Sequence, residues 1–188
     1  MGSFVHLNVH SEYSIYDGLV RLDALIEAAK KDQMPAVALT DRSNLFAAVK
    51  FYQAAVRAGI KPILGADCQL LDDVTGQDSS LSRMILLCQN NQGYQNLAQL
   101  ITQSYIKRPQ SGEPIVRLSE LTRETAQGLL LLSGGQTGIF AHALMHDDAA
   151  RLQTQYDYLA TRFDTRLYLE IHQVGFEGED AYTDAALH

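Results

Sequence analysis

The chain has 188 residues, of which 46% are hydrophobic and 20% are charged, so it is long enough for one domain with its own core. Its formal net charge is −7 and its 15 basic residues are scattered, which argues against a domain that grips a phosphate backbone by itself. No apolar run approaches the ~20 residues that cross a bilayer, and the N-terminus lacks a signal-peptide pattern.

The first third of the chain alternates between strand-like and helical patterns. Residues 4–10 read FVHLNVH, in which apolar and polar side chains alternate, as is typical of a strand. Apolar residues recur at helical spacing over 18–33 and again over 44–59, where Gly59 suits a C-terminal cap. The short apolar run between them, 34–41, predicts a second strand.

The rest of the chain continues this alternation to its end. Further strands are expected over 60–71 and 83–89, separated by the turn-rich residues 72–80. The later elements are expected to be a helix over 93–107, a loop over 108–114, a short helix near 118–126, a strand over 129–134, helices near 137–147 and 149–163, a strand over 166–173 and the start of a last helix. Apolar strands separated by helices predict an α/β fold with a parallel sheet, as a barrel or a doubly wound sheet. No linker is visible, so 1–188 is one domain.

Polar residues gather where the predicted strands end. The set comprises His10, Thr40, Asp41, Asp67, Ser133 and His172. In parallel α/β proteins, functional sites are built at the C-terminal edge of the sheet. The pattern therefore favours a site at that edge.

The first predicted strand carries the most suggestive polar residues. His6, Asn8 and His10 share one face of a strand, with neighbours roughly 6–7 Å apart. A His-x-His pair at this spacing can bind metal, but a hydrogen-bonded polar face is the reading that these residues alone favour. Asp17 and Asp41 are plausible hard ligands, or else a turn residue and a helix cap.

Three further patterns suggest chemistry less strongly. His142 and His146 have the spacing of a zinc-binding helix, but Ala143 stands where a metalloprotease needs glutamate, so we interpret them as polar-face histidines. The glycine-rich residues 133–138 lack the Lys-Ser/Thr of a P-loop and favour a tight turn. Cys68 and Cys88 lie in apolar runs and predict buried thiols in a reducing, cytoplasmic setting.

Four motifs in order, VHSEYSIYDGL, MPAVALTDRSNL, AGIKPILGAD and NNQGYQNLAQLI, closely resemble one family. It is the PHP (polymerase and histidinol phosphatase) domain of the bacterial replicative DNA polymerase III alpha subunit, of the proteobacterial type. GLLLLSGG and RLYLEI continue the resemblance, which covers residues 4–188; the first three residues read as a cloning remnant. The resemblance implies a distorted (β/α)7 TIM-like barrel with up to three metal ions at its C-terminal edge. The last strand or strands, with a final Asp-x-His motif, are expected beyond His188.

The resemblance also implies that the metal site is degenerate. The first His-x-His motif corresponds to Asn8 and His10, and the aspartate that follows is kept as Asp17. The Thr-Asp-His motif ends at Asp41 and Arg42, so an imidazole is replaced by a guanidinium.

Three more ligand positions differ from the family pattern. A glutamate is shortened to Asp67, a histidine corresponds to Arg83, and a cysteine corresponds to Gly135. At least four ligands are thus replaced, two of them by cations, which we expect to pair with Asp17, Asp41 or Asp67. No bound metal and no catalytic residue are expected, and His10, Asp17 and Asp67 are the ligands that remain.

By resemblance, the parent protein is a nucleotidyltransferase that elongates DNA with Mg²⁺, using aspartates of a later domain. This fragment is expected to be an inactive scaffold without a cofactor, docking other polymerase III subunits and especially the proofreading exonuclease subunit. DNA would be contacted only through other domains, and no membrane is involved. The alternatives are a residual metal-dependent phosphoesterase, acting as a 3′–5′ exonuclease or pyrophosphatase, and a purely structural domain.

Overall fold

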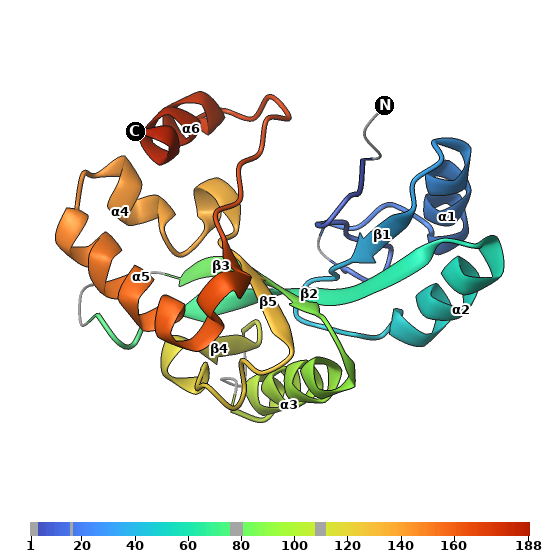
Figure 1. The fold of residues 1–188 in the computed structure, drawn as a ribbon, viewed down its shortest axis with the longest axis horizontal. Helices are drawn as coiled ribbons and strands as arrows, with labels where there is room; N and C mark the ends of the chain where they lie inside the picture. Colours follow the sequence, from blue (N-terminus) through green and yellow to red (C-terminus); the bar gives the residue numbers. More distant parts are fainter. Residues whose placement is uncertain (1–3, 16, 76–80, 108–111) are drawn as a thin grey trace.

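The computed structural model describes residues 4–15, 17–75, 81–107 and 112–188. Within them the chain forms one open sheet with helices around it (Figure 1). The strands are β1 (Ala36–Leu39), β2 (Lys61–Leu71), β3 (Leu81–Cys88), β4 (Ile115–Arg117), β5 (Leu129–Leu132) and β6 (Leu167–Tyr168). The helices are α1 (Leu22–Lys31), α2 (Ala48–Ala58), α3 (Asn91–Lys107), α4 (Ala141–Met145), α5 (Ala149–Phe163) and α6 (Glu179–Leu187).

The sheet is mixed, so the predicted all-parallel sheet is wrong. Its order is β1-β2-β3-β5-β6, with β4 also pairing with β2. β3 runs antiparallel to both β2 and β5, whereas the β1–β2, β2–β4 and β5–β6 pairs are parallel. A parallel crossover needs a dozen or more residues, usually a helix, and the turn-rich residues between β2 and β3 are too few. The two strands therefore form an antiparallel pair.

The expected fold is a TIM-like barrel lacking its last strand or strands, and the described sheet is indeed open, with β1 and β6 at its ends. The predicted strand over 4–10 is absent as a regular strand. Its backbone still follows β1, since the amides of Ala38 and Thr40 donate to the carbonyls of His6 and Val9 at 2.9 Å. The segment thus brings its polar side chains to the sheet without a continuous ladder.

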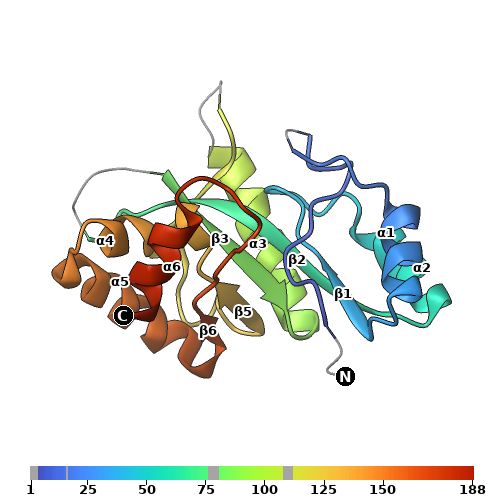
Figure 2. The same cartoon turned by 90° about the horizontal axis from the view of Figure 1, so that it is seen from above.

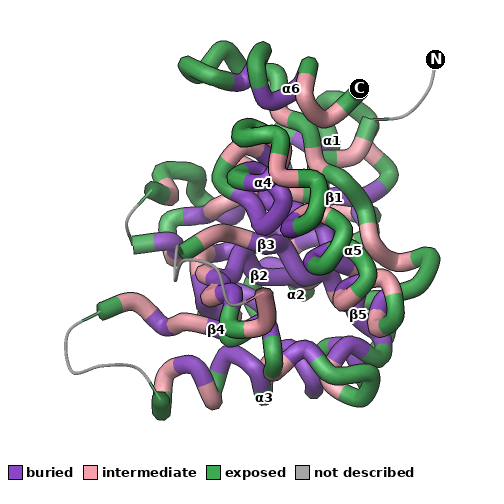
Figure 3. Tube along the Cα trace, turned by 90° about the vertical axis from the view of Figure 1, so that its left-hand side faces the viewer, coloured by how far each residue is buried: buried purple, intermediate pink, exposed green. Residues whose placement is uncertain are grey.

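Alternate residues of β2 and β3 serve opposite faces of the sheet. One face of the sheet is covered by α3 and α5, and we call it the outer face. On it lie Ala66, Cys68, Met84 and Leu86, which belong to the main hydrophobic core. The inner face carries a smaller cluster around Ile85. Figure 3 shows the buried residues running along these central strands, and Figure 2 shows α1 and α2 at one end of the sheet and α4 to α6 at the other.

Most predicted helices are confirmed within a few residues, including the left-handed cap at Gly59, whose φ is 77°. The short helix near 118–126 contracts to the 3-10 turn Leu118–Glu120, and the strand over 166–173 to β6. β4 was not predicted. The loops predicted over 72–80 and 108–114 lie partly outside the described residues, as does the interpretation of residues 1–3.

Both cysteines are free thiols, as the sequence predicts. Cys68 is buried and Cys88 is half-buried. Burial raises the pKa of the Cys88 thiol to about 12 and raises that of Cys68 as well, so neither is a reactive thiolate near neutral pH. No helix among the described residues is long and apolar enough to span a membrane.

The contact between Gly93 and Gly128 provides a test of the fold. A Cβ at Gly93 would lie 1.8 Å from the carbonyl oxygen of Gly128, just before β5. Replacing a helix glycine by alanine ordinarily stabilises a helix. We expect Gly93→Ala instead to lower the free energy of unfolding by about 1–3 kcal/mol, because helix and strand must move apart. Urea unfolding would measure the change, with Gln99→Ala, an exposed α3 substitution, changing it by less than about 0.5 kcal/mol.

Candidate functional site

Asp67 of β2 is a buried carboxylate with two basic partners, Arg83 and His10. Its side chain is 4% exposed. Arg83 Nε lies 3.0 and 3.1 Å from the two carboxylate oxygens, and Arg83 Nη2 contacts Oδ2. The antiparallel register explains this approach, because Arg83 stands opposite Gln69 and therefore diagonally across from Asp67 on the same face. His10 Nε2 contacts Asp67 Oδ2 at 3.1 Å from the N-terminal segment.

Asp17 is a second carboxylate that contacts His10. His10 Nδ1 lies 3.1 Å from Asp17 Oδ1, and Arg42 Nη1 lies 3.6 Å from Asp17 Oδ2. Arg42 Nη2 in turn donates to Glu113 Oε2 at 3.1 Å. Basic and acidic side chains thus alternate. We call this set the ion-pair cluster, and in order it consists of Arg83, Asp67, His10, Asp17, Arg42 and Glu113.

The cluster favours the charged form of its basic members. Burial lowers the pKa of His10, but the hydrogen bond to Asp67 and the charges of Asp67 and Asp17 outweigh it, so the pKa lies above its ordinary value. The pKa of Arg83 is raised in the same way, with Asp67 outweighing burial. Both nitrogens of a protonated His10 donate, which matches its position between two carboxylates.

Asp41 does not join the cluster, since of the three expected carboxylates the arginines pair with Asp17 and Asp67. Its Oδ1 accepts from the Ser11 amide at 2.7 Å and from the Ser14 hydroxyl at 3.0 Å, and both of its oxygens accept from the Ser11 hydroxyl. The Ser14 hydroxyl also accepts from the backbone amide of Arg42 at 2.8 Å. Asp41 therefore holds the loop after His10 in place, and it caps no helix.

Asn8 belongs to a separate polar group centred on Glu170. Asn8 donates to Glu170 Oε1 at 3.2 Å and accepts from the Thr40 hydroxyl at 2.9 Å. His172 Nε2 also contacts Glu170 Oε1, at 2.7 Å, and the Gly134 amide donates to Oε2 at 3.1 Å. The carboxylate of Glu170 therefore connects the N-terminal segment to the glycine-rich turn.

Gly135 shows why a side chain does not fit at one of the predicted ligand positions. Its φ is 59°, and an added Cβ would lie 2.9 Å from His172 Nδ1. The imidazole of His172 therefore occupies the space that a cysteine at this position would need. Gly135 contributes shape and no ligand atom.

Sequence reasoning missed two carboxylates of these groups, Glu170 and Glu113. Glu170 and His172 are two residues apart in the predicted strand 166–173, and that spacing alone would have placed them on one face. Glu113 lies in the predicted loop 108–114, which has no periodicity, and no pattern marks it. His142 and His146 are not in the cluster; their rings stack on α4 with centroids 4.3 Å apart.

Comparisons with known proteins agree on one family. The family model described as the PHP domain matches residues 6–173. The DNA polymerase III subunit alpha of Pseudomonas aeruginosa is 39% identical over 185 residues, and that of Escherichia coli K12 is 40% identical over 184. The chain belongs to the PHP domain family. The matches cover 98% of this PHP domain but only 16% of each polymerase subunit, so the chain spans a small part of the length of these relatives.

A solved structure supports the fold of the PHP domain independently. A Bifidobacterium adolescentis protein, assigned as a metal-dependent phosphoesterase, superposes with a TM-score of 0.60. The alignment covers 97% of this chain and 82% of that protein at 11% sequence identity. At this identity the likeness concerns the fold alone. The overall fold of this chain is thus shared with a solved protein.

At the expected metal-ligand positions, the described side chains contact one another and do not converge as a set of metal ligands. Within the described ranges, no group of three or more His, Cys, Asp or Glu side chains is arranged to hold a metal ion. Arg83 contacts both oxygens of Asp67, and His10 uses both ring nitrogens for carboxylates. A divalent cation needs several free donor atoms and no opposing charge. We therefore derive no chemistry that passes through a metal here.

The Arg83–Asp67 pair can be tested by a double-mutant cycle. Arg83→Met leaves the buried carboxylate with one cation fewer, so we expect the free energy of unfolding to fall by about 3–5 kcal/mol. Adding Asp67→Asn should recover part of this loss, because the uncompensated charge is gone. Urea unfolding of both single variants and the double variant gives the coupling, and the exposed Arg57→Met serves as the control. Additive effects of the two substitutions would contradict the pair.

His172 predicts a pH dependence of stability. The hydrogen bond to Glu170 outweighs burial and raises the pKa of His172, with the charges of Glu170, Glu179 and Asp67 acting in the same direction. A raised folded pKa means that the stabilisation is fully present below pH 6.5, the ordinary value, and is lost as the pH rises through the folded pKa. The stability difference between the unmodified chain and His172→Gln should therefore shrink over that range. A difference that does not change with pH would contradict the assignment.

Proposed function

We propose that this chain is the PHP module of a DNA polymerase III alpha subunit and serves it as an inactive docking and scaffold domain. The observation that carries the proposal is the ion-pair cluster. In it, guanidinium groups form ion pairs with the carboxylates at the expected metal positions. The relatives are polymerase subunits about six times longer than the matched region, since the match covers 16% of them. Mg²⁺-dependent nucleotide transfer would then belong to other parts of the polymerase.

The charges of the cluster support the proposed inactivity. Metal-assisted hydrolysis of a phosphoester needs a metal ion to activate water and to polarise the phosphoryl oxygen. At the positions concerned, Arg42 and Arg83 supply positive charge without a site for water activation. A guanidinium is protonated at all physiological pH values, so it cannot act as the general base either. The same pairs keep the carboxylates compensated and the scaffold stable.

The docking role rests on the family and on the charge of the chain. The family resemblance implies that inactive PHP domains contact a separate proofreading exonuclease subunit. A net charge of −7 disfavours DNA as the direct partner and is compatible with a protein partner. The exonuclease subunit is therefore the partner that we propose, with the remaining polymerase III subunits reached through the rest of the alpha subunit.

Metal content tests the inactivity directly. After incubation with Zn²⁺ or Mn²⁺ and desalting, elemental analysis should find far less than one metal per chain, because the donor atoms are occupied. The variant Asn8→His, Arg42→His, Asp67→Glu and Arg83→His removes both cations and should gain measurable binding by calorimetric titration. Gly135 is left unchanged because of its contact with His172. Stoichiometric metal in the unmodified chain, or metal-dependent cleavage of a 3′ end, would overturn the proposal.

Co-purification with the exonuclease subunit of the same organism tests the docking role. The tagged chain should retain that subunit on a column, whereas an unrelated domain of similar charge should not. Arg83→Met should weaken retention only as far as it lowers the folded fraction. If a well-folded chain retains no exonuclease subunit, the domain is structural and the docking role is wrong.

A further inference from the structure

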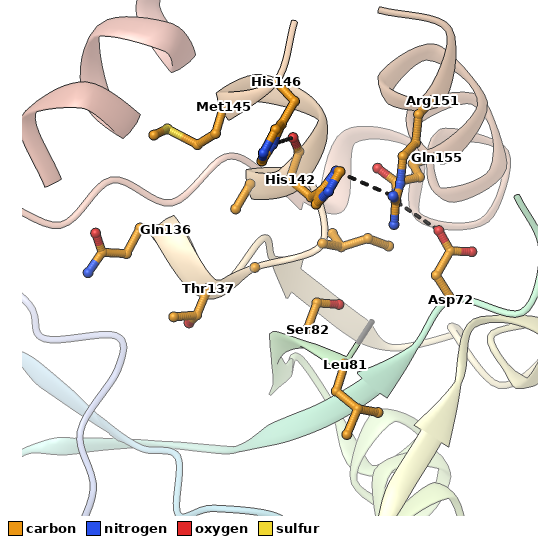
Figure 4. A pocket seen from close by; sticks show the side chains of 13 residues that line it. Asp72, Leu81, Ser82, Gln136, Thr137, His142, Met145, His146, Arg151 and Gln155 are labelled. Carbon is orange, nitrogen blue, oxygen red and sulfur yellow. Dashed lines mark hydrogen bonds between the residues drawn. The ribbon is translucent and has the colours of Figure 1, made fainter. Parts of the chain in front are cut away.

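A second polar site lies beneath α4 and α5, in a cavity of about 290 Å³ (Figure 4). Its lining includes Ser82 of β3, Thr137 of the glycine-rich turn, His142 of α4, and Arg151 and Gln155 of α5. We call this cavity the Arg151 pocket. It belongs to elements that the ion-pair cluster does not use, apart from strand β3.

The Arg151 pocket and the ion-pair cluster lie on opposite faces of the sheet. Ser82 and Arg83 are neighbours on β3, so their side chains point to opposite sides. Ser82 stands opposite Leu70, a residue of the main core on the outer face, whereas Arg83 reaches Asp67 on the inner face. The pocket is therefore a separate site and not an extension of the metal-ligand positions.

Arg151 is a buried cation without a carboxylate partner. Its residue is only 5% exposed, although it lies near the start of a surface helix. Its Nη1 lies 3.3 Å from His142 Nδ1, and its Nε has no hydrogen-bond partner. None of the ion pairs found among the described residues involves its side chain, and the Asp148 carboxylate accepts only from its backbone amide. A buried charge normally needs a counter-charge, so this guanidinium is electrostatically incomplete.

The carboxylate of Asp72, which lines the pocket, already accepts hydrogen bonds from other groups. Asp72 Oδ2 accepts from Gln155 Nε2 and from the Thr75 hydroxyl, both at 2.8 Å. Asp72 Oδ1 accepts from the amides of Val74 and Thr75 at 3.2 and 3.1 Å. Figure 4 shows Arg151 and Gln155 side by side, with Arg151 directed to His142 and Gln155 to Asp72. Asp72 thus anchors Gln155 and does not pair directly with Arg151.

The other unsatisfied groups define what would complete the pocket. Gln155 Oε1 and Ser82 Oγ are buried and have no partner. Because His142 Nδ1 accepts from Arg151, the proton of the neutral ring is on Nε2, which is free to donate. The pocket thus presents one cation, two neutral donors and one acceptor. At its rim, Leu81 and Met145 are about half exposed and offer apolar contact.

We propose that the Arg151 pocket binds a small phosphate monoester. The phosphate oxygens would accept from Arg151, His142 Nε2 and Ser82, because charge-assisted bonds from arginine to phosphate are the strongest of this kind. The organic part would lie against Leu81 and Met145, and a hydroxyl of the ligand would donate to Gln155 Oε1. This site goes beyond the docking role and does not depend on it.

Calorimetric titration with three probes tests the proposal. Adenosine 5′-monophosphate should bind, inorganic phosphate should bind more weakly, and adenosine should not bind, since the phosphate supplies the counter-charge. Arg151→Gln should weaken binding of the monophosphate about tenfold or more. Arg57→Gln removes the same charge from an exposed position on α2 and should leave the affinity unchanged. If inorganic phosphate binds as tightly as the monophosphate, the pocket is a site for free phosphate and the proposal of a monoester ligand is wrong.

A second variant keeps the test decisive if Arg151→Gln does not fold. Thr137 is exposed at the rim, so Thr137→Trp should fill the cavity, leave the buried cluster intact and abolish binding. Adenosine binding as well as its monophosphate, or both variants binding like the unmodified chain, would overturn the proposal. Absence of any binding at millimolar concentrations would do so too, and would mean that water bridges Arg151 to Asp72 instead.

Discussion

The buried carboxylate of Asp67 is the constraint on which the inner side of this protein depends. An ionised carboxylate that is 4% exposed is tolerated only with strong partners. Arg83 and His10 supply them from β3 and from the N-terminal segment. The backbone of Asp67 is also bound, because the Ser43 amide donates a hydrogen bond to its carbonyl at 2.8 Å. One residue thereby fixes the β2–β3 pair, the N-terminal segment and the turn after β1 relative to one another.

This constraint has two mutually exclusive solutions at such a site. Clustered carboxylates can be compensated by metal ions, which also supply chemistry, or by guanidinium groups, which supply stability and hydrogen bonds but no Lewis acid. Arg42 and Arg83 realise the second solution here. The ion pairs of Arg42 and Arg83 thus compensate the carboxylates in this fold.

The arginine side chains on the two faces of the sheet have different kinds of partner. On the inner face Arg83 is paired with Asp67, within a row of alternating basic and acidic side chains. On the outer face the side chain of Arg151 contacts the imidazole of His142, while Asp72 is held by Gln155 and by its own turn. Because a compensated cation needs no ligand and an uncompensated one does, the outer pocket is the better place to look for a small anion.

The sequence by itself determined the family and the order of the main helices, because these depend on local periodicity and on motifs such as Thr40-Asp41-Arg42. It also contained the missed evidence for an antiparallel β2–β3 pair, namely a connection without a helix. Only the tertiary structure decided which charges meet. Asp41 bonds to Ser11 and Ser14 rather than to an arginine, Glu113 and Glu170 enter from distant segments, and His172 fills the space beside Gly135. The reason is that ion pairs depend on distances of a few ångströms between segments far apart in the chain, which periodicity within one segment does not encode.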